Sequence, residues 1–480
     1  MRLRAANKRS ADSLVRVRRH VCQNSTDMAV RAPNQRGSVL IIVLWIAFGL
    51  VAITLYFANS MSLELRASDN RVSGVIADQA IEGAARYVRY VLSNWGTNGM
   101  VPDVTSYARA AVPVGDAHFW LIGRDTNNPV GAGQLYCGLV DEASKLNLNT
   151  ATSNMLITAL ESLPQINLDL AAAIIDWRDT NGTGASQTYY AMLHPAYQCK
   201  SYPFETVDEL RLVYGADMQT LVGEDVNRNG ILDPDENDDN GNGMPDPGIL
   251  DYVTVYSREP GTYSNGVLRV DIRIVRGTNG PLGSLLQSTF GAARAGQILA
   301  RPGFVNSGSN AVSTVPYASP LQFYRRSGMS SDEFAQIANA LTVSGNTNYI
   351  EGRVNINTAR PAVLACLPGF TTDLAQQLVT YRQLNPDKLT SIAWVVNALG
   401  QNNAATLQAL EAGDYITTQS YQFSADVAAL GPYGRGYRRT RFVFDTSGGT
   451  PRIVYRQDLS HLGWALGKEV RQTWLAKPTQ

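Results

Sequence analysis

The chain has 480 residues, more than one typical domain holds, so two or three domains are expected. Lys plus Arg equal Asp plus Glu at 41 each, which excludes a polyelectrolyte. Basic residues are concentrated before residue 37, so the remainder is net acidic, which argues against a nucleic-acid surface. The chain has only four histidines and lacks Gly-x-Ser-x-Gly, His-Glu-x-x-His and phosphate-loop motifs, so we do not expect an enzyme.

An uncharged apolar segment follows the basic N-terminal region. No charged residue lies between Arg36 and Glu64, and about 20 apolar residues suffice to cross a bilayer. The basic residues before it predict that the N-terminus is cytoplasmic and that the chain after Leu63 lies across the membrane. A cleaved secretory signal is the alternative, but its apolar region would be only about 7–15 residues long.

The helical pattern continues past the apolar segment. Residues 64–95 contain no proline, and apolar side chains recur at helical spacing. This stripe comprises Ile76, Ala80, Ala84, Val88 and Val91. The sequence therefore predicts one helix over residues 38–95 that begins in the membrane and emerges amphipathic, which favours a retained anchor over a discarded signal.

Arg36-Gly37-Ser38 before this helix resembles the leader of type IV pilin-like proteins. The resemblance implies that a prepilin peptidase cleaves between Gly37 and Ser38, that residues 1–37 are a leader, and that the new amino group is methylated. That family usually carries Glu at the fifth mature residue, where this chain has Ile42. This departure is similar to one subfamily, the K-type minor pseudopilins of type II secretion (general secretion pathway protein K). Translation from Met1 or from Met28, which begins a compact basic leader, remains open.

Strand-like runs follow the helix and return near the C-terminus. His118–Ile122 and Leu135–Val140 flank a turn-rich segment, within residues 96–144. Three later runs, within residues 413–480, are 415–427, 437–444 and 452–456. The resemblance implies that both groups form one antiparallel sheet against the helix of residues 38–95, an α+β, type IV pilin-like fold.

An internal repeat lies between the two groups of strands. Lys145–Ala151 returns as Arg353–Ala359, each with Asn-x-Asn-Thr-Ala and the same apolar pattern downstream. Asn and Thr cap helix starts, and the recurrence resembles the helix–hairpin–helix units of the inserted helical domain of K pseudopilins, here residues 145–412.

Helix–hairpin–helix units elsewhere hold DNA, so a minor type IV pilin or competence-type protein that binds DNA is the alternative function. Such hairpins present backbone amides to phosphate, typically through Gly-apolar-Gly. Pro164–Asn167 has no glycine, Pro368–Thr371 has Thr in place of the second one, and neither has a Lys or Arg cluster nearby. We therefore expect structural hairpins and no nucleic acid.

The strongest site motif lies within residues 224–251. Its first loop matches the EF-hand pattern at every specified position, which predicts Ca²⁺ as cofactor. Its expected ligands are Asp225, Asn227, Asn229, the Ile231 carbonyl, Asp233 and Glu236. A second loop offers Asp238, Asn240, Asn242, the Met244 carbonyl and Asp246. The twelfth position of the second loop is Ile249, so this loop is incomplete unless Asp251 or a neighbour substitutes.

Residues 258–350 are an extra insertion relative to the K family, to which we assign no function. Pairing among Cys137, Cys199 and Cys366 remains open. The resemblance implies a non-enzymatic minor pseudopilin that caps the pseudopilus tip and supports its assembly and protein export. Its expected partners are the I and J minor pseudopilins, the major pseudopilin and the prepilin peptidase. It would be a single-pass protein of the bacterial inner membrane, with its bulk in the periplasm.

Overall fold

The structure is a computed structural model that describes residues 36–95, 99–124, 135–161, 168–182, 184, 186–263, 266–274, 279–301, 317–345 and 347–475. The chain divides into two compact units, Met1–Ala67 and Ser68–Gln480.

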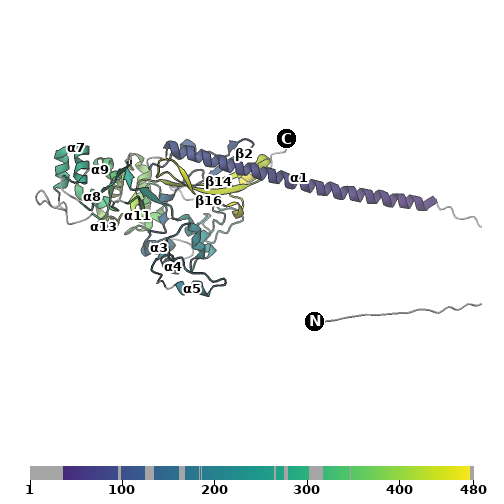
Figure 1. Ribbon diagram of the computed structural model, residues 1–480, viewed down its shortest axis with the longest axis horizontal. Helices are drawn as coiled ribbons and strands as arrows, with labels where there is room; N and C mark the ends of the chain where they lie inside the picture. The colour runs from purple at the N-terminus through teal and green to yellow at the C-terminus, as the bar shows by residue number, and fades with distance from the viewer. Residues whose placement is uncertain are drawn as a thin grey trace, which may run out of the picture. The chain divides into compact units, whose positions relative to one another are not determined.

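Helix α1 (Arg36–Trp95) confirms the predicted long N-terminal helix (Figure 1). Its apolar part is long enough to cross a membrane, and no other helix among the described residues is long and apolar enough to do so. It fits a single-pass anchor.

The second unit contains a six-stranded antiparallel sheet assembled from distant parts of the chain. Its strands are β1 (Val112–Val114), β2 (Ala117–Ile122), β3 (Val140–Asp141), β14 (Gln422–Leu430), β15 (Arg438–Asp445) and β16 (Arg452–Asp458). The order is β1-β2-β14-β15-β16, and β3 pairs with β14. The central strand β14 pairs with β2 through Val427 and Leu121, and with β15 through Val427 and Thr440.

The expected strand over residues 135–140 was wrong in extent. Only Cys137 forms a bridge, to Ile122, before the two-residue strand β3 begins at Val140. The physical reason is that one edge of β2 is paired with β14 through Ile122, and the other is paired with β1 over residues 117–119, which leaves only the end of β2 free. The segment can therefore reach β2 only at its end, where the Gly138 amide donates to the Leu121 carbonyl at 3.0 Å.

A core of small and aromatic side chains lies between the sheet and the part of α1 after residue 68. Ala80, Ala84, Val88 and Val91 are buried there, as the predicted stripe requires, while Ile76 is partly buried. The sheet contributes alternate residues of β14, namely Phe423, Ala425, Val427 and Ala429, because successive side chains of a strand point to opposite faces.

The opposite face of the sheet is covered by the C-terminal segment. Trp120 and Leu430 form a core with Ala465 and Leu466, and helix α14 (Gly467–Leu475) places Trp474 edge-on to Trp120, with ring centroids 5.8 Å apart. Both faces of the sheet are therefore buried at β2 and β14.

The helices inserted between the strands share one large hydrophobic core. They include α3 (Ser153–Glu161), α4 (Leu168–Arg178), α5 (Gln187–Met192), α6 (Met218–Val222), α10 (Pro361–Ala365), α11 (Thr372–Leu384), α12 (Trp394–Leu399) and α13 (Ala404–Glu411). Helix α2 (Val104–Tyr107) precedes the sheet. Short parallel pairs join β4 (Leu146–Asn147) to β5 (Val253–Thr254), and β12 (Val354–Asn355) to β13 (Ile416–Thr417).

The two repeat copies form equivalent hydrogen bonds. The amide of Asn149 donates to Asn147 Oδ1 at 2.9 Å, and the amide of Asn357 donates to Asn355 Oδ1 at 2.9 Å. The hairpin of the first copy, residues 164–167, lies outside the described residues, so helix–hairpin–helix identity stays a prediction.

Each copy also has an arginine that reaches back from its second helix. Arg178 donates to the carbonyls of Leu148 and Ala151. Arg382 donates to the carbonyls of Ile356 and Ala359, at 3.1 and 2.7 Å. Each guanidinium thus binds the Asn-x-Asn-Thr-Ala turn of its own copy to the following helix.

The two ends of the insertion, residues 258–350, lie side by side, because β6 (Arg258–Pro260) pairs antiparallel with β11 (Tyr349–Glu351). Its helices α7 (Pro281–Leu299), α8 (Pro320–Ser327) and α9 (Ser331–Ile337) gather in one group (Figure 1). Short strands β7 (Thr262–Tyr263), β8 (Val267–Leu268), β9 (Val270–Asp271) and β10 (Leu341–Thr342) complete it. Leu282, Phe323 and Phe334 extend the large helical core.

The three cysteines that the structure describes are free. Cys366 directly follows α10 and is buried, and burial raises the pKa of its thiol to about 12. Cys137 and Cys199 are half-buried.

Replacing Arg382 by Ala should lower the free energy of unfolding by about 2 kcal/mol, because two buried carbonyls would lose a charged donor. The exposed Arg452 provides the matched control, and its replacement by Ala should change stability by less than about 0.5 kcal/mol. Urea-induced unfolding measures both variants. Equal stabilities of the two variants would contradict this role for Arg382.

Candidate calcium site

In the first predicted loop, backbone amides donate hydrogen bonds to the carboxylate of Asp225. Its Oδ1 accepts from the Asn229 amide and its Oδ2 from the Gly230 amide, both at 2.8 Å. Gly230 has φ of +81°, which a residue without a side chain adopts at little cost. The tight turn at this glycine is the conformation that an EF-hand loop needs at its sixth position.

The other side chains of the first loop gather around Asp233. The Nδ2 atoms of Asn227 and Asn229 donate to Asp233 Oδ2, at 2.7 and 2.8 Å. Glu236 accepts from the Asn227 and Asp233 amides, at 3.1 and 3.0 Å. The amide of Ile231 donates to Asn229 Oδ1 at 2.8 Å. The structure therefore brings together the side chains predicted from the first loop.

Burial disfavours the charged forms of two carboxylates in this loop. Burial raises the pKa of Asp225, although Arg124 lies 3.6 Å away. Burial, with smaller contributions from Asp225 and Asp233, raises the pKa of Glu236 to about 7. Asn227 Oδ1 is buried and accepts no hydrogen bond from a described residue, a state that costs free energy unless a donor or cation is supplied.

Carboxylates alone do not form a metal site in this part of the molecule. Among the described residues, no group of three or more His, Cys, Asp or Glu side chains is arranged to hold a metal ion. A cation here would depend on amide and backbone oxygens as well, which are the hard ligands that Ca²⁺ accepts.

The second predicted loop repeats the geometry of the first. Asp238 accepts from the Asn242 and Gly243 amides, at 3.0 and 2.8 Å. The Nδ2 atoms of Asn240 and Asn242 donate to Asp246 Oδ2, at 2.6 and 2.8 Å. Met244 corresponds to Ile231, because its amide donates to Asn242 Oδ1 at 2.7 Å.

Glu224 occupies the place of the missing glutamate of the second loop. Its Oε1 accepts from the Asp239 amide at 2.8 Å and its Oε2 from the Asp246 amide at 3.2 Å, much as Glu236 binds two amides of the first loop. The expectation that Asp251 could substitute was wrong, because its Oδ2 binds Arg360 at 2.6 Å and its Oδ1 lies 3.4 Å from Arg124.

A close crossing of the chain brings Glu224 to the second loop. The Glu224 amide donates to the Asp246 carbonyl at 2.9 Å, and the Gly248 amide to the Val222 carbonyl at 2.7 Å. A Cβ atom on Gly223 would lie 2.3 Å from the Asp246 oxygen, and one on Gly248 would lie 2.4 Å from the Leu221 carbonyl. The sequence signal that we missed is an acidic residue immediately before the first loop, flanked by a glycine.

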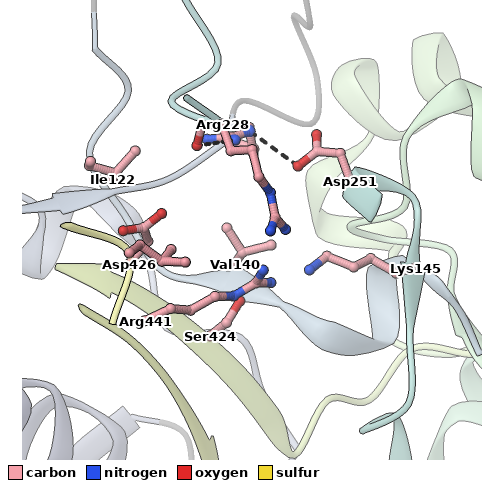
Figure 2. Close-up of a pocket in the computed structure, with 10 residues that line it drawn as sticks. Ile122, Val140, Lys145, Arg228, Asp251, Ser424, Asp426 and Arg441 are labelled. Atoms are coloured by element: carbon pink, nitrogen blue, oxygen red, sulfur yellow. Dashed lines mark hydrogen bonds and ion pairs between the residues drawn. The ribbon is translucent and has the colours of Figure 1, made fainter. Parts of the chain in front are cut away.

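The first loop is fastened to the sheet and to the C-terminal segment. Arg439 of β15 is fully buried and donates to the carbonyls of Asn227 and Arg228. Arg124 also donates to the Arg228 carbonyl, at 2.8 Å. The Nδ2 atoms of Asn227 and Asn229 reach the carbonyls of Trp464 and Ala465, each at 3.2 Å. Figure 2 shows the neighbouring junction, with the guanidinium of Arg228 turned toward Arg441 of the sheet.

The predicted cleavage residues lie elsewhere. Gly37 and Ser38 are in the first turn of α1, which begins at Arg36. The rest of the predicted leader, residues 1–35, lies outside the described residues. Ile42 is exposed on α1.

Comparison with known proteins gives one family match. Residues 138–222 match the family model described as type II secretion system, protein K. This segment runs from just before β3 to the end of α6, so it includes the first repeat copy and ends before the two loops. Comparison with curated proteins finds no match.

Among solved structures, the chain is similar to one in the crystal structure of the GspK–GspI–GspJ complex from the enterotoxigenic Escherichia coli type 2 secretion system. The identity is 10%, the similarity covers 82% of this chain and 99% of that chain, and the TM-score is 0.37.

Proposed function

We propose that this chain, a member of the type II secretion system protein K family, is the minor pseudopilin that caps the tip of the secretion pseudopilus. The family match over residues 138–222 carries the assignment to secretion. The apolar helix α1, whose later part packs on an antiparallel sheet, supports a pilin-like subunit. The basic residues before Arg36 support a cytoplasmic N-terminus, with the second unit in the periplasm.

The tip position rests on residue 42. A carboxylate at membrane depth costs a few kcal/mol unless it is neutralised. In pilin-like filaments the glutamate at this position is expected to meet the amino group of the subunit above. Ile42 offers no such carboxylate, and a subunit with none above it does not need one. Partners would then be the I and J minor pseudopilins beside it and the major pseudopilin below.

Mass spectrometry of the mature protein should find Ser38 at its N-terminus. Replacing Gly37 by Leu should leave the precursor uncleaved, because the peptidase would no longer meet its glycine. Gly49→Ala is the control, since no atom lies within 4 Å of the Cβ position there, and it should be processed normally. An N-terminus within residues 58–62 would instead indicate a secretory signal and would contradict the pilin assignment.

The full chain, purified from membranes in detergent, should retain the I and J minor pseudopilins. Ile42→Glu should retain both to the same extent, because tip binding does not use this side chain. Quantitative mass spectrometry of the purified complex measures the ratio. Loss of both partners, together with salt-sensitive DNA binding, would favour the alternative of a DNA-binding pilin.

We further propose that each loop binds one Ca²⁺. The first site would use Asp225, Asn227, Asn229, the Ile231 carbonyl, Asp233 and Glu236. The second would use Asp238, Asn240, Asn242, the Met244 carbonyl and Asp246, with Glu224 as its closing ligand. The orphaned Asn227 Oδ1 supports this proposal. Since the first loop is hydrogen-bonded to β15 and to the C-terminal segment, we propose a structural clamp, with dissociation constants of about 10⁻⁴–10⁻³ M.

Calorimetry should find two calcium ions per chain, and one each for Glu236→Ala and Glu224→Ala. Calcium at ten times its dissociation constant should stabilise the folded chain by about 1.4 kcal/mol for each site. The exposed Glu161, replaced by Ala, is the matched control and should retain both ions. An identical Tm in calcium and in EGTA, without measurable calcium binding, would contradict both sites.

A further inference from the structure

A cavity of about 30 Å³ lies where the sheet meets the inserted part of the chain, beside the first loop (Figure 2). Four cationic side chains line it, Arg124, Lys145, Arg228 and Arg441, against two carboxylates, Asp251 and Asp426. The cavity is distinct from the proposed calcium sites, because side-chain cations rather than oxygen ligands predominate in its wall.

Three of these cations face one another. Figure 2 shows the ends of Arg228, Arg441 and Lys145 turned toward the same space, although they come from a loop, a strand and the start of the first repeat. Burial and, next, the charge of Arg441 lower the pKa of Arg228 to about 10. Like charges this close repel one another unless an anion lies between them.

The carboxylates around the cavity are committed to other cations. Asp426 binds Arg439 at 2.6 Å, and Asp251 binds Arg360 and Arg124. Glu142 Oε1 is shared between Lys145 at 2.9 Å and Arg441 at 3.4 Å. Asp208, which attracts Arg228 from farther away, lies 3.5 Å from Arg211 and accepts from Gln457.

The guanidinium of Arg228 therefore forms no ion pair within the described part of the chain, although Asp251, Asp208 and Asp426 attract it from farther away. No carboxylate lies within 4 Å of it there, and none of its side-chain nitrogens donates a hydrogen bond to a described residue. Lys145, Arg228 and Arg441 together have the single close carboxylate of Glu142, so positive charge is in excess.

The position of Arg228 is fixed by its backbone. It has φ of +58°, an uncommon conformation for a residue with a side chain. Its carbonyl accepts from both Arg124 and Arg439, each at 2.8 Å. The side chain therefore starts from a clamped loop beside the cavity that it lines.

We propose that this cavity binds one small monovalent anion of the halide class, chloride being the physiological example. A cavity needs about 10–15 Å³ to hold one water molecule, so this one, at about 30 Å³, has room for a single halide. Arg228, Arg441 and Lys145 would donate to it. The ion would join the sheet, through Arg441, to the inserted part, through Arg228 and Lys145.

The test compares anions on the full chain in detergent, with calcium supplied as its gluconate at saturating concentration. Halide binding by the folded state should raise Tm by about 2 °C in sodium chloride or bromide relative to sodium gluconate at equal ionic strength. Crystals grown in bromide should show an anomalous peak between Arg228, Arg441 and Lys145. Because calcium is saturating throughout, failure of this proposal and failure of the calcium sites are distinguishable.

Arg228→Asn supplies the decisive variant, because Asn tolerates positive φ and removes the charge. Its Tm should be the same in sodium chloride, bromide and gluconate and, in gluconate, no lower than that of the unmodified chain. The exposed Arg452→Ala is the matched control and should keep the full dependence on halide.

Equal Tm values in all salts for the unmodified chain, with no bromide peak, would mean that only water fills the cavity. Full halide dependence in Arg228→Asn would place the ion elsewhere. Either result overturns the proposal.

Discussion

The fully buried guanidinium of Arg439 is the interaction on which the arrangement of the second unit depends. It pairs with Asp426 of the central strand β14 and donates to two carbonyls of the loop at residues 227 and 228. Removing such a charge from water costs several kcal/mol, so it persists only where good partners surround it. Because those partners belong to the sheet and to the loop, separating the two would leave a buried charge unpaired.

Arg228 connects two regions of opposite electrostatic character. Its backbone carbonyl belongs to an oxygen-rich loop in which burial raises the pKa of Asp225 and Glu236. Its side chain enters a cavity in which cations are in excess. Each region by itself is unfavourable, because the low dielectric of the interior strengthens repulsion as well as attraction. An ion of the appropriate sign in each would relieve both.

The sheet also constrains how the chain folds. Strand β2 ends at Ile122 and its neighbour β14 begins at Gln422. The inserted helices lie between them in the sequence. Pairings this distant are slow to form, because loop closure must precede the contacts that reward it. The repeat copies, by contrast, form their Asn-x-Asn turns from residues close in sequence, so we expect these turns to form before the sheet closes.

The sequence by itself determined the features that depend on local periodicity and spacing. These are the apolar helix that turns amphipathic at Ile76 to Val91, the strand at residues 118–122, the recurrence of Asn-x-Asn-Thr-Ala, and the two loops with Asx residues on alternate positions. Each of these patterns follows from 3.6-residue or two-residue repeats or from turn chemistry within a dozen residues.

The tertiary structure decided what required distant partners. The strand expected at residues 135–140 is shorter because β1 and β14 leave only the end of β2 free. The crossing at Gly223 and Gly248, which only a pair of glycines permits, gave the second loop Glu224 in place of Asp251. The cation-rich cavity could not be predicted from a chain with balanced charge, because Lys145, Arg228 and Arg441 lie far apart in sequence and meet only when the sheet packs against residues 145–412.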